Sequence, residues 1–307
     1  MAELEVLDTG PLTTVQDLGR PGRAHLGVGR SGAADRGALR LANRLLANPE
    51  GAAALEVTLG GLRVRAHGRL VIALTGAPCP ATVTDASGRN RIIGHQSVER
   101  LPDGATLWLG VPGQGLRTYV AVRGGLDVPE VLGSRSTDTL AGLGPERPSP
   151  GSLLPVGPPP RTHPLVDLAP LPWSAPGRLG ELVLEVLPGP RAGWFHPGAL
   201  RALCAEPYAV TADSDRVGIR LSGPRLERAR DGELSSEGMV PGALQVPPSG
   251  RPTLFLADHP VTGGYPVIAV VRDRDVDRAA QARPGQRVRF RPSPAMRAAS
   301  AVRLGPP

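Results

Sequence analysis

The sequence predicts a mainly β protein built from two related β-barrel-like domains with a few short helices. Glycine (40 residues) and proline (35 residues) are spread through all 307 positions, which is typical of short strands joined by tight turns. Apolar runs of strand length recur along the chain, whereas a clear helical period is rare. Segments of the first half also return in the second half at an offset of about 180 residues.

The first element is a strand at Leu4–Leu7, whose residues alternate in polarity before a turn at Asp8–Pro11. A polar, glycine-rich loop follows, from Thr13 to Asp35. Asp35 is a suitable N-cap for a helix that ends at Asn48-Pro49. The apolar positions of this helix recur at helical spacing: Ala38, Leu41, Ala42, Leu45 and Leu46.

The rest of the first half predicts strands punctuated by Gly-Gly and His-Gly turns. These strands are 54–59, 62–66, 70–74, 106–111 and 117–122. A proline-dense stretch without periodicity then predicts an interdomain linker with some packed irregular structure. We therefore expect a first domain at 1–143, a linker at 144–178 and a second domain at 179–307.

The second half repeats features of the first. Leu182–Leu187 resembles the opening strand, and Asp215 heads a segment like the one that Asp35 heads. Pro284–Val288 matches Pro102–Thr106. Three matches at nearly constant offset indicate an ancient internal duplication.

The charged residues exclude several function classes. The net charge of +7 comes entirely from arginine, since the chain contains no lysine. A Walker-type phosphate loop, a Schiff base and a biotinylated lysine on this chain are therefore excluded. The arginines are scattered singly, without a basic patch interleaved with aromatic residues, so we expect no nucleic-acid partner.

Two cysteines, Cys79 and Cys204, are too few for a disulfide framework and suit a reducing cytosol. The N-terminus has no basic and apolar leader pattern, and the longest apolar runs have strand length. We expect a cytoplasmic protein without a membrane span. The six histidines show no paired spacing, so we expect no metal site.

Polar residues beside glycines are the candidates for chemistry. Carboxylates in a polar cleft can act as general bases, and the alternative for each one is a turn-capping role. The carboxylates in question are Asp17, Asp35, Asp215 and Asp258. Arg216 could clamp a carboxylate or phosphate, or form a structural ion pair. The late turn Thr262–Pro266 would let backbone approach a ligand closely.

The order of the motifs resembles one family across nearly the whole chain. These motifs include Thr13–Arg20, Gly32–Asp35, Leu55–Gly60, Gly124–Pro129, Leu132–Asp138, Leu187–Pro190, Ser214–Gly218, Gln245–Pro247 and Thr262–Pro266. They resemble the C subunit of bacterial 5-oxoprolinase. This family is also called KipA, allophanate-hydrolase-subunit-2-like or biotin-dependent carboxyltransferase.

The resemblance implies two cyclophilin-like β-barrel domains and a heteromeric enzyme. The complex would contain a KipI-like B subunit and a LamB/YcsF-like A subunit. It would open 5-oxo-L-proline to L-glutamate with ATP and Mg²⁺. Phosphorylation of the stable lactam oxygen would give an activated imidate that water can attack, and arginines and backbone N–H groups could stabilise the transferring group without lysine.

The resemblance also implies the site residues, which we expect around one hollow shared by the two domains and completed by the B subunit. The catalytic candidates are Asp17, Asp35, Asp215, Arg216 and Asp258. The substrate-binding candidates are Thr14, Gln16, Arg20, Ser31, Ser214, Gln245, Thr262, Gly263, Gly264 and Tyr265. Which carboxylate is the base stays open.

Two alternative functions remain. The chain could be a carboxyltransferase component of the urea carboxylase type, with biotin on another chain, or a KipA-like regulator that binds a KipI-like partner. Family members usually carry Gln-Thr-Thr before Gly-Gly-Tyr-Pro, whereas this chain has Pro260-Val261-Thr262. This departure leaves the choice of substrate in that pocket open.

Overall fold

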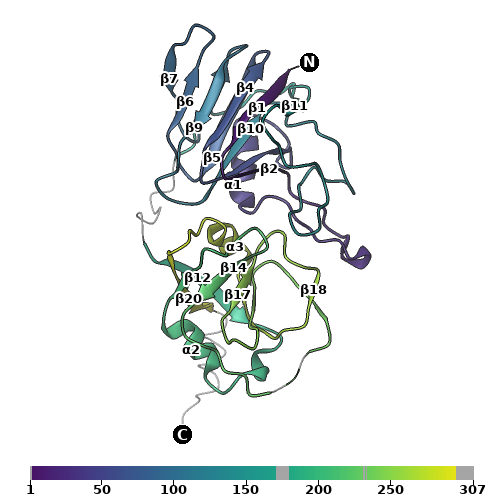
Figure 1. Ribbon diagram of the computed structural model, residues 1–307, viewed down its shortest axis with the longest axis vertical. Coiled ribbons are helices and arrows are strands. Elements are labelled where there is room, and N and C mark those ends of the chain that lie inside the picture. Colours follow the sequence, from purple (N-terminus) through teal and green to yellow (C-terminus); the bar gives the residue numbers. More distant parts are fainter. Residues whose placement is uncertain (1, 171–179, 231, 233, 295–307) are drawn as a thin grey trace. The chain divides into compact units, whose positions relative to one another are not determined.

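The computed structural model describes residues 2–170, 180–230, 232 and 234–294. The chain forms two compact units, the first from Met1–His25 and Arg30–Arg178, the second from Leu26–Gly29 and Leu179–Pro307. Strands dominate both units, and three α-helices occur in the described part (Figure 1). The mainly β fold is therefore confirmed.

The strands of the first unit form two antiparallel sheets. The six-stranded sheet has the order β11 (Leu153–Pro155), β1 (Glu3–Thr9), β4 (Leu62–His67), β9 (Thr106–Leu109), β6 (Ala81–Thr84), β7 (Asn90–Ile92). The five-stranded sheet has the order β2 (Leu12–Gln16), β3 (Ala54–Thr58), β10 (Arg117–Val122), β5 (Leu70–Gly76), β8 (Val98–Leu101). The strands expected in this half of the chain are all present.

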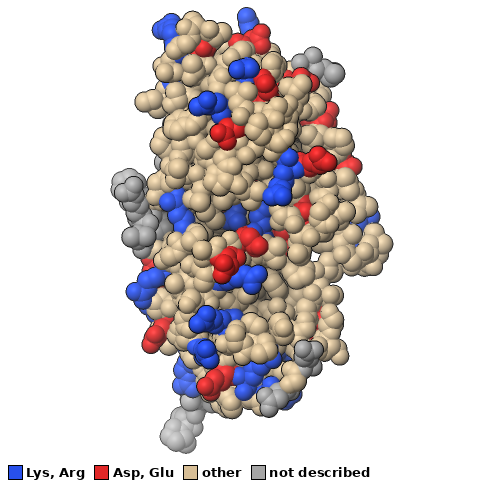
Figure 2. Space-filling model, in the orientation of Figure 1, with Lys and Arg blue, Asp and Glu red and all other residues tan. Residues whose placement is uncertain are grey.

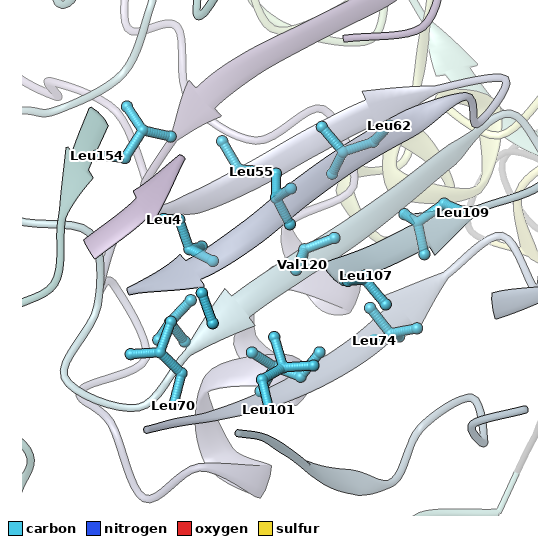
Figure 3. Packing of buried hydrophobic residues seen from close by; sticks show 14 of the residues in the cluster. Leu4, Leu55, Leu62, Leu70, Leu74, Leu101, Leu107, Leu109, Val120 and Leu154 are labelled. Carbon is cyan, nitrogen blue, oxygen red and sulfur yellow. The ribbon is translucent and has the colours of Figure 1, made fainter. Parts of the chain in front are cut away.

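One hydrophobic core lies between these sheets. Leu4 and Leu62 of the six-stranded sheet pack with Leu55, Leu74 and Val120 of the five-stranded sheet (Figure 3). The alternation along β4, buried at every second residue, is what a sheet with one solvent face requires. The first unit is thus a two-sheet structure, and its ladder does not close into the single ring that a strict barrel would have.

Helix α1 (Arg36–Leu45) covers the outer face of the five-stranded sheet. Its apolar side, with Leu39 and Leu45, packs against Ala73, Tyr119 and Ala121 of that sheet. The helix begins where expected, because the Asp35 carboxylate accepts a hydrogen bond from the backbone N–H of Ala38 (2.9 Å). A short 3₁₀ helix, η1 (Ala24–Leu26), lies in the preceding loop.

Residues 144–170 of the proline-dense stretch pack within the first unit and are not the linker that the sequence predicted. β11 pairs with β1, and Leu154 is buried in the core of the first unit. Prolines suit this place because β11 is an edge strand, where a missing N–H leaves no ladder bond unmade. Residues 171–178 of the expected linker lie outside the described residues.

The second unit contains the expected barrel. Seven strands close in the order β12 (Leu182–Pro188), β19 (Val267–Val271), β16 (Ala243–Gln245), β17 (Thr253–Phe255), β14 (Gly218–Ser222), β13 (Tyr208–Val210), β20 (Arg287–Pro292). A separate ribbon pairs β15 (Glu237–Gly238) with β18 (Thr262–Gly263). The remaining elements are η2 (Ala192–Trp194), α2 (Ala199–Ala205) and α3 (Asp273–Ala279).

Two of the three sequence matches between the halves hold in local structure. β1 and β12 each open a unit, and the turns at Gly104 and Gly285 both adopt positive φ just before a strand. The third match is wrong. Asp35 caps a helix, whereas Asp215 lies in a turn that leads into β14, because Gly218–Ser222 carries the strand pattern and no helical apolar stripe.

None of the described helices is long and apolar enough to cross a membrane. On the face drawn in Figure 2, arginines and acidic side chains are interspersed over the surface. No large area of one sign stands out on that face.

Candidate active-site residues in each unit

Thr14 and Gln16 lie on a strand and not in the polar loop that the sequence predicted. They belong to β2, which pairs with β3 so that Thr14 faces Glu56 and Gln16 faces Ala54. The run Leu12–Gln16 contains two threonines and a valine, and such β-branched residues favour a pleated strand over a loop. The polar residues are consequently held on a rigid element.

The Gln16 amide is fully buried. Its Nε2 donates to Thr14 Oγ1 (3.0 Å) and to the backbone carbonyl of Thr137 (2.9 Å). Its Oε1 is a buried acceptor that has no hydrogen-bond partner among the described residues. An unpaired buried acceptor costs free energy, so this oxygen is suited to receive a donor from a bound molecule or water.

Asp17 ties two loops together. Its Oδ1 accepts from Gly19 N (2.7 Å), Ser134 Oγ (2.7 Å) and Ser136 Oγ (2.5 Å), and its Oδ2 accepts from Arg135 N (2.6 Å). All these donors are neutral, and together they occupy the carboxylate. The geometry favours a structural role for Asp17 over that of a general base.

Arg20 is a buried guanidinium with incomplete pairing. Only 2% of the residue is exposed, and its Nη2 donates to the Ser136 carbonyl (2.5 Å) while Nε donates to the Val131 carbonyl (3.3 Å). Its Nη1 has no hydrogen-bond partner in the described part of the chain. A buried cation with an unused donor favours an anionic or carbonyl oxygen as its ligand.

Ser31 joins the same group of residues. Its hydroxyl donates to the Thr137 carbonyl (3.4 Å), the oxygen that also receives the Gln16 amide. Its backbone is left-handed (φ 52°), which is uncommon for a residue other than glycine. The structure therefore brings Thr14, Gln16, Arg20 and Ser31 together along residues 136 and 137.

Asp35 lies at the start of α1, where its carboxylate serves as the helix cap. Its backbone N–H donates to the hydroxyl of Tyr119 (2.8 Å), and that hydroxyl donates to Glu56 Oε2 (2.7 Å). Arg117 Nε lies 3.4 Å from Glu56 Oε1, so the chain of buried polar groups ends in an ion pair. Burial raises the pKa of the Tyr119 hydroxyl well above its usual range, and the nearby Glu56 charge adds to this.

In the second unit Arg216 and Asp258 form a two-bond ion pair. Arg216 Nε donates to Asp258 Oδ2 (2.9 Å) and Nη2 donates to Oδ1 (3.1 Å), and each residue is 1% exposed. Of the two interpretations of Arg216, the structure favours the ion pair, because Asp258 accepts the two guanidinium hydrogen bonds that would otherwise bind a ligand. The same pairing occupies the Asp258 carboxylate.

Ser214 and Asp215 form the turn before β14. Asp215 Oδ1 accepts from the N–H groups of Val217 (2.8 Å) and Gly218 (3.0 Å), and Ser214 Oγ accepts from Arg220 N (3.0 Å). These are the bonds of a capped turn. The geometry favours the turn-capping alternative for Asp215.

The turn around Tyr265 surrounds the amide of Gln245. Gln245 Nε2 donates to the Tyr265 carbonyl (3.2 Å), and a Cβ on Gly263 would come within 2.6 Å of that nitrogen. A larger residue at position 263 would therefore displace the Gln245 amide. Arg228 stacks over the Tyr265 ring at 5.6 Å, while Thr262 is exposed on β18 and the Gly264 carbonyl accepts from Leu234 N (3.3 Å).

Each unit thus gathers part of the predicted set. The first unit holds Thr14, Gln16, Asp17, Arg20 and Ser31, and the second holds Arg216 with Asp258, and Gln245 with residues 263–265. One hollow shared by both units stays a prediction. Within the described residues, no three His, Cys, Asp or Glu side chains come together as metal ligands.

Some residues of these hydrogen-bond and ion-pair networks were not predicted as site residues from the sequence. Glu56, Tyr119 and Arg117 are buried on β3 and β10, and Arg191 pairs with Glu237 beside the β15–β18 ribbon. A charged residue inside the apolar run Ala54–Val57 was the available signal for Glu56. Glu237-Gly238 is one of the motifs that carry the family resemblance, but no local signal indicates that Glu237 pairs with Arg191, 46 positions away.

Comparison with known proteins gives consistent matches over the chain. A model of the family described as carboxyltransferase domain, subdomain A and B, matches residues 26–292. The C subunit of 5-oxoprolinase from Escherichia coli is 38% identical over 293 residues, covering 94% of this chain and 90% of that protein. Its counterpart of the same name from Haemophilus influenzae is 33% identical with the same two coverages.

Larger proteins contain a similar segment. The urea amidolyase of Saccharomyces cerevisiae is 32% identical over 94% of this chain but only 16% of its own length. The Kluyveromyces lactis urea carboxylase structure superposes with a TM-score of 0.86 at 31% identity, covering 94% of this chain and 27% of that chain. The crystal structure of TTHA0988 gives 0.82 at 38% identity, covering 95% of this chain and 55% of that one, so this chain spans about half of it.

Proposed function

This chain belongs to the carboxyltransferase domain, subdomain A and B, family, and we propose that it is the C subunit of an ATP-dependent 5-oxoprolinase. The observation that carries the proposal is its 38% identity to the E. coli protein of that name, over 90% of that protein's length. In the urea amidolyases the same likeness covers about a sixth of the protein. A separate subunit, acting with A-type and B-type partners, is therefore the favoured context.

The Gln16–Arg20 group supports a cyclic amide as the ligand. Gln16 Oε1 is a buried acceptor and Arg20 Nη1 is a buried donor, and neither has a partner among the described residues. A ring amide offers the complementary pair, an N–H donor and a carbonyl acceptor. A carbonyl that gains negative charge during ring opening would also be stabilised by a guanidinium N–H.

ATP and Mg²⁺ enter the proposal as reactants of the assembled complex. A five-membered lactam is a stable amide with a poor leaving group, so hydrolysis needs an activating group, and ATP would supply a phosphoryl group. This chain has no lysine, so arginine and backbone N–H groups would have to stabilise phosphoryl charge wherever this chain contributes. Biotin cannot be attached to this chain for the same reason.

Reconstitution tests the proposal directly. The purified chain is mixed with its A-type and B-type partner chains, 5-oxo-L-proline, ATP and Mg²⁺, and both glutamate and ADP are followed. We expect equal amounts of both products, and none when this chain is omitted. Complete mixtures that form no glutamate, with all three chains folded, would reject the function.

A pair of variants tests the role of the amide. Gln16→Leu removes the unpaired acceptor and should raise KM for 5-oxoproline about tenfold or more, since a buried hydrogen bond to a ligand is lost. Gln114→Leu, in a first-unit loop outside this group, is the matched control and should keep the normal KM. Equal KM values for the two variants would remove Gln16 from the site.

The second candidate is a carboxyltransferase component, favoured by the family description and by the urea amidolyases. It would require a biotin carrier on another chain. Its signature is incorporation of labelled bicarbonate that avidin blocks, together with no glutamate formation. The two candidates therefore give opposite results in the same reconstituted mixture.

A further inference from the structure

The second unit carries a hollow of about 300 Å³ on the surface where β12, α3 and β20 meet. We call it the arginine hollow, defined by Val183, Glu185, Arg274, Asp275, Arg278 and Arg291. Figure 1 shows these three elements in the second unit, and none of the lining residues belongs to the candidate site described above. Its volume lies at the lower end of the range of about 300–1,000 Å³ for small-molecule sites.

Glu185 forms one part of the floor and is held by three arginines. Its Oε2 accepts from Arg274 Nη2 (2.7 Å) and Arg272 Nη1 (3.3 Å), and its Oε1 accepts from Arg291 Nη2 (2.9 Å). Burial alone would raise the pKa of Glu185, but the Arg291 hydrogen bond and the charges of Arg274 and Arg291 bring the net pKa below its usual value. Glu185 therefore stays ionised and fixes the surrounding guanidinium groups.

Asp275 forms the other part of the floor and is also occupied. Its Oδ2 accepts from the backbone N–H of Glu185 (2.7 Å) and its Oδ1 accepts from Arg278 Nη1 (2.9 Å). Arg278 Nη1 donates as well to the Val183 carbonyl (3.1 Å). Both carboxylates are thus engaged by protein groups and are not available to a cation.

The rim carries more positive charge than the floor neutralises. Three arginines (274, 278 and 291) and two carboxylates (185 and 275) line the hollow, so the excess is one positive charge. The side chains of Arg274, Arg278 and Arg291 remain 65%, 53% and 53% exposed. Asp273 and Asp277 are also on α3, but neither lines the hollow.

Each rim arginine uses one guanidinium nitrogen in these contacts, and a guanidinium has several further N–H donors. The carboxylates of the floor restrain the three groups around one small volume. Preorganised guanidinium groups match the oxygens of phosphate, which accept several charge-assisted hydrogen bonds at once.

We propose that the arginine hollow binds a phosphate-type oxyanion, either free or as the terminal phosphate of a nucleotide, through Arg274, Arg278 and Arg291. The proposal does not depend on the function proposed above, because it concerns other residues and a binding reaction. The competing explanation is that these ion pairs only hold α3 and β20 against β12 and bind no ligand.

Calorimetric titration of the full chain at low salt distinguishes these explanations. The probes are inorganic phosphate, pyrophosphate, ADP and adenosine. The test variant is Arg274→Gln/Arg278→Gln, which leaves Arg272 and Arg291 on Glu185. The charge-matched control is Arg201→Gln/Arg251→Gln, two exposed arginines of the same unit whose side chains lie outside the hollow.

We expect pyrophosphate and ADP to bind, adenosine to give no signal, and the test variant to bind at least about tenfold more weakly than the control. Phosphate alone as tight as ADP would identify a free ion as the ligand, and ADP tighter than phosphate would identify a nucleotide; either result supports the proposal. If no phosphate probe binds the native chain, or both double variants weaken binding equally, the proposal is overturned. Should the double variant unfold, the single Arg274→Gln variant, at the most exposed rim position, gives the same comparison.

Discussion

The two units each hold a buried loop aspartate, Asp17 and Asp258, by different means. Asp17 in the first unit accepts hydrogen bonds from two hydroxyls and two backbone N–H groups, all neutral. Asp258 in the second unit accepts two bonds from the Arg216 guanidinium. Losing one donor leaves Asp17 with three others, whereas losing Arg216 removes both bonds that the guanidinium donates to Asp258. Asp258 is therefore more vulnerable than Asp17 to a single substitution among its partners.

The largest effect is expected from Arg216→Ala. Removing one partner of a buried ion pair typically costs about 3–5 kcal/mol, because the remaining charge stays buried. Urea unfolding of the full chain measures the loss, and hydrogen exchange should place it in β14 and β17. The control Arg201→Ala, on the exposed side of α2, should change stability by less than about 0.5 kcal/mol. A loss below about 1 kcal/mol for Arg216→Ala would show that the pair is not what stabilises this region.

Asp17→Asn should cost less, about 1–3 kcal/mol. The amide keeps one acceptor oxygen, but its NH₂ group would face the donating N–H of Arg135 or the serine hydroxyls. Amide exchange should accelerate at residues 17–20 and 134–137, with smaller changes elsewhere. The exposed Glu146→Gln, which removes the same charge from the same unit, should leave unfolding unchanged. Equal stability of the two variants would contradict the structural role of Asp17.

Two neighbouring glycines test the packing of the loop around Ser136 in the first unit. Gly142 and Gly144 both have positive φ, but a Cβ on Gly144 would come within 2.0 Å of the Ser136 carbonyl, while one on Gly142 meets nothing within 4 Å. Both alanine variants should lose about 1–2 kcal/mol for the left-handed backbone, and Gly144→Ala should lose more. Thermal unfolding of both measures the difference, which should vanish if the 136–144 contact is absent in solution.

The smallest effect concerns the two cysteines, one in each unit. Burial raises the pKa of the Cys204 thiol to about 11. Burial also raises the pKa of the Cys79 thiol, although the hydrogen bond from Thr118 partly offsets this. The folded state therefore holds the thiol proton more tightly than the unfolded chain, in which a cysteine pKa is near 8.5. This contribution to stability is fully present below about pH 8.5 and is lost as the pH rises towards 11. Cys204→Ala should therefore flatten the fall in stability over that range. Rapid alkylation of native Cys204 at pH 9, as fast as in urea, would contradict the raised pKa.

Periodic patterns predicted most of the fold. The spacing of α1, its Asp35 cap and the expected strands of the first unit followed from local chemistry, which a single sequence displays. In the second unit the same chemistry predicted β12 but not β13, β14, β16 or β17. The sheet order did not, since β11 joins β1 across about 150 residues and no local signal records that pairing. The proline-rich segment was predicted to be a linker because proline excludes a central strand, but proline permits an edge strand such as β11.

The candidate site was predicted less completely than the fold. The family resemblance, and not residue type, named Gln16 and Arg20, and their role in binding stays a prediction; the structure adds that each is buried with one polar atom that has no partner among the described residues. Residue type gave Asp17, Asp215 and Asp258 equal standing as candidate bases. Only the folded arrangement distinguishes a carboxylate already surrounded by donors from one that is free. Glu56 was missed because one acidic residue in an apolar strand has no spacing partner that would mark it.

The barrel of the second unit closes through a parallel pair between its first and last strands, β12 and β20. The ribosome synthesises β12 about a hundred residues before β20, so the nascent barrel has an open seam until Arg287–Pro292 has emerged. The first unit obtains its last strand, β11, much earlier in synthesis. During translation, chaperones would accordingly meet a finished first unit and an unfinished second one, whose exposed seam is the part most prone to wrong pairing.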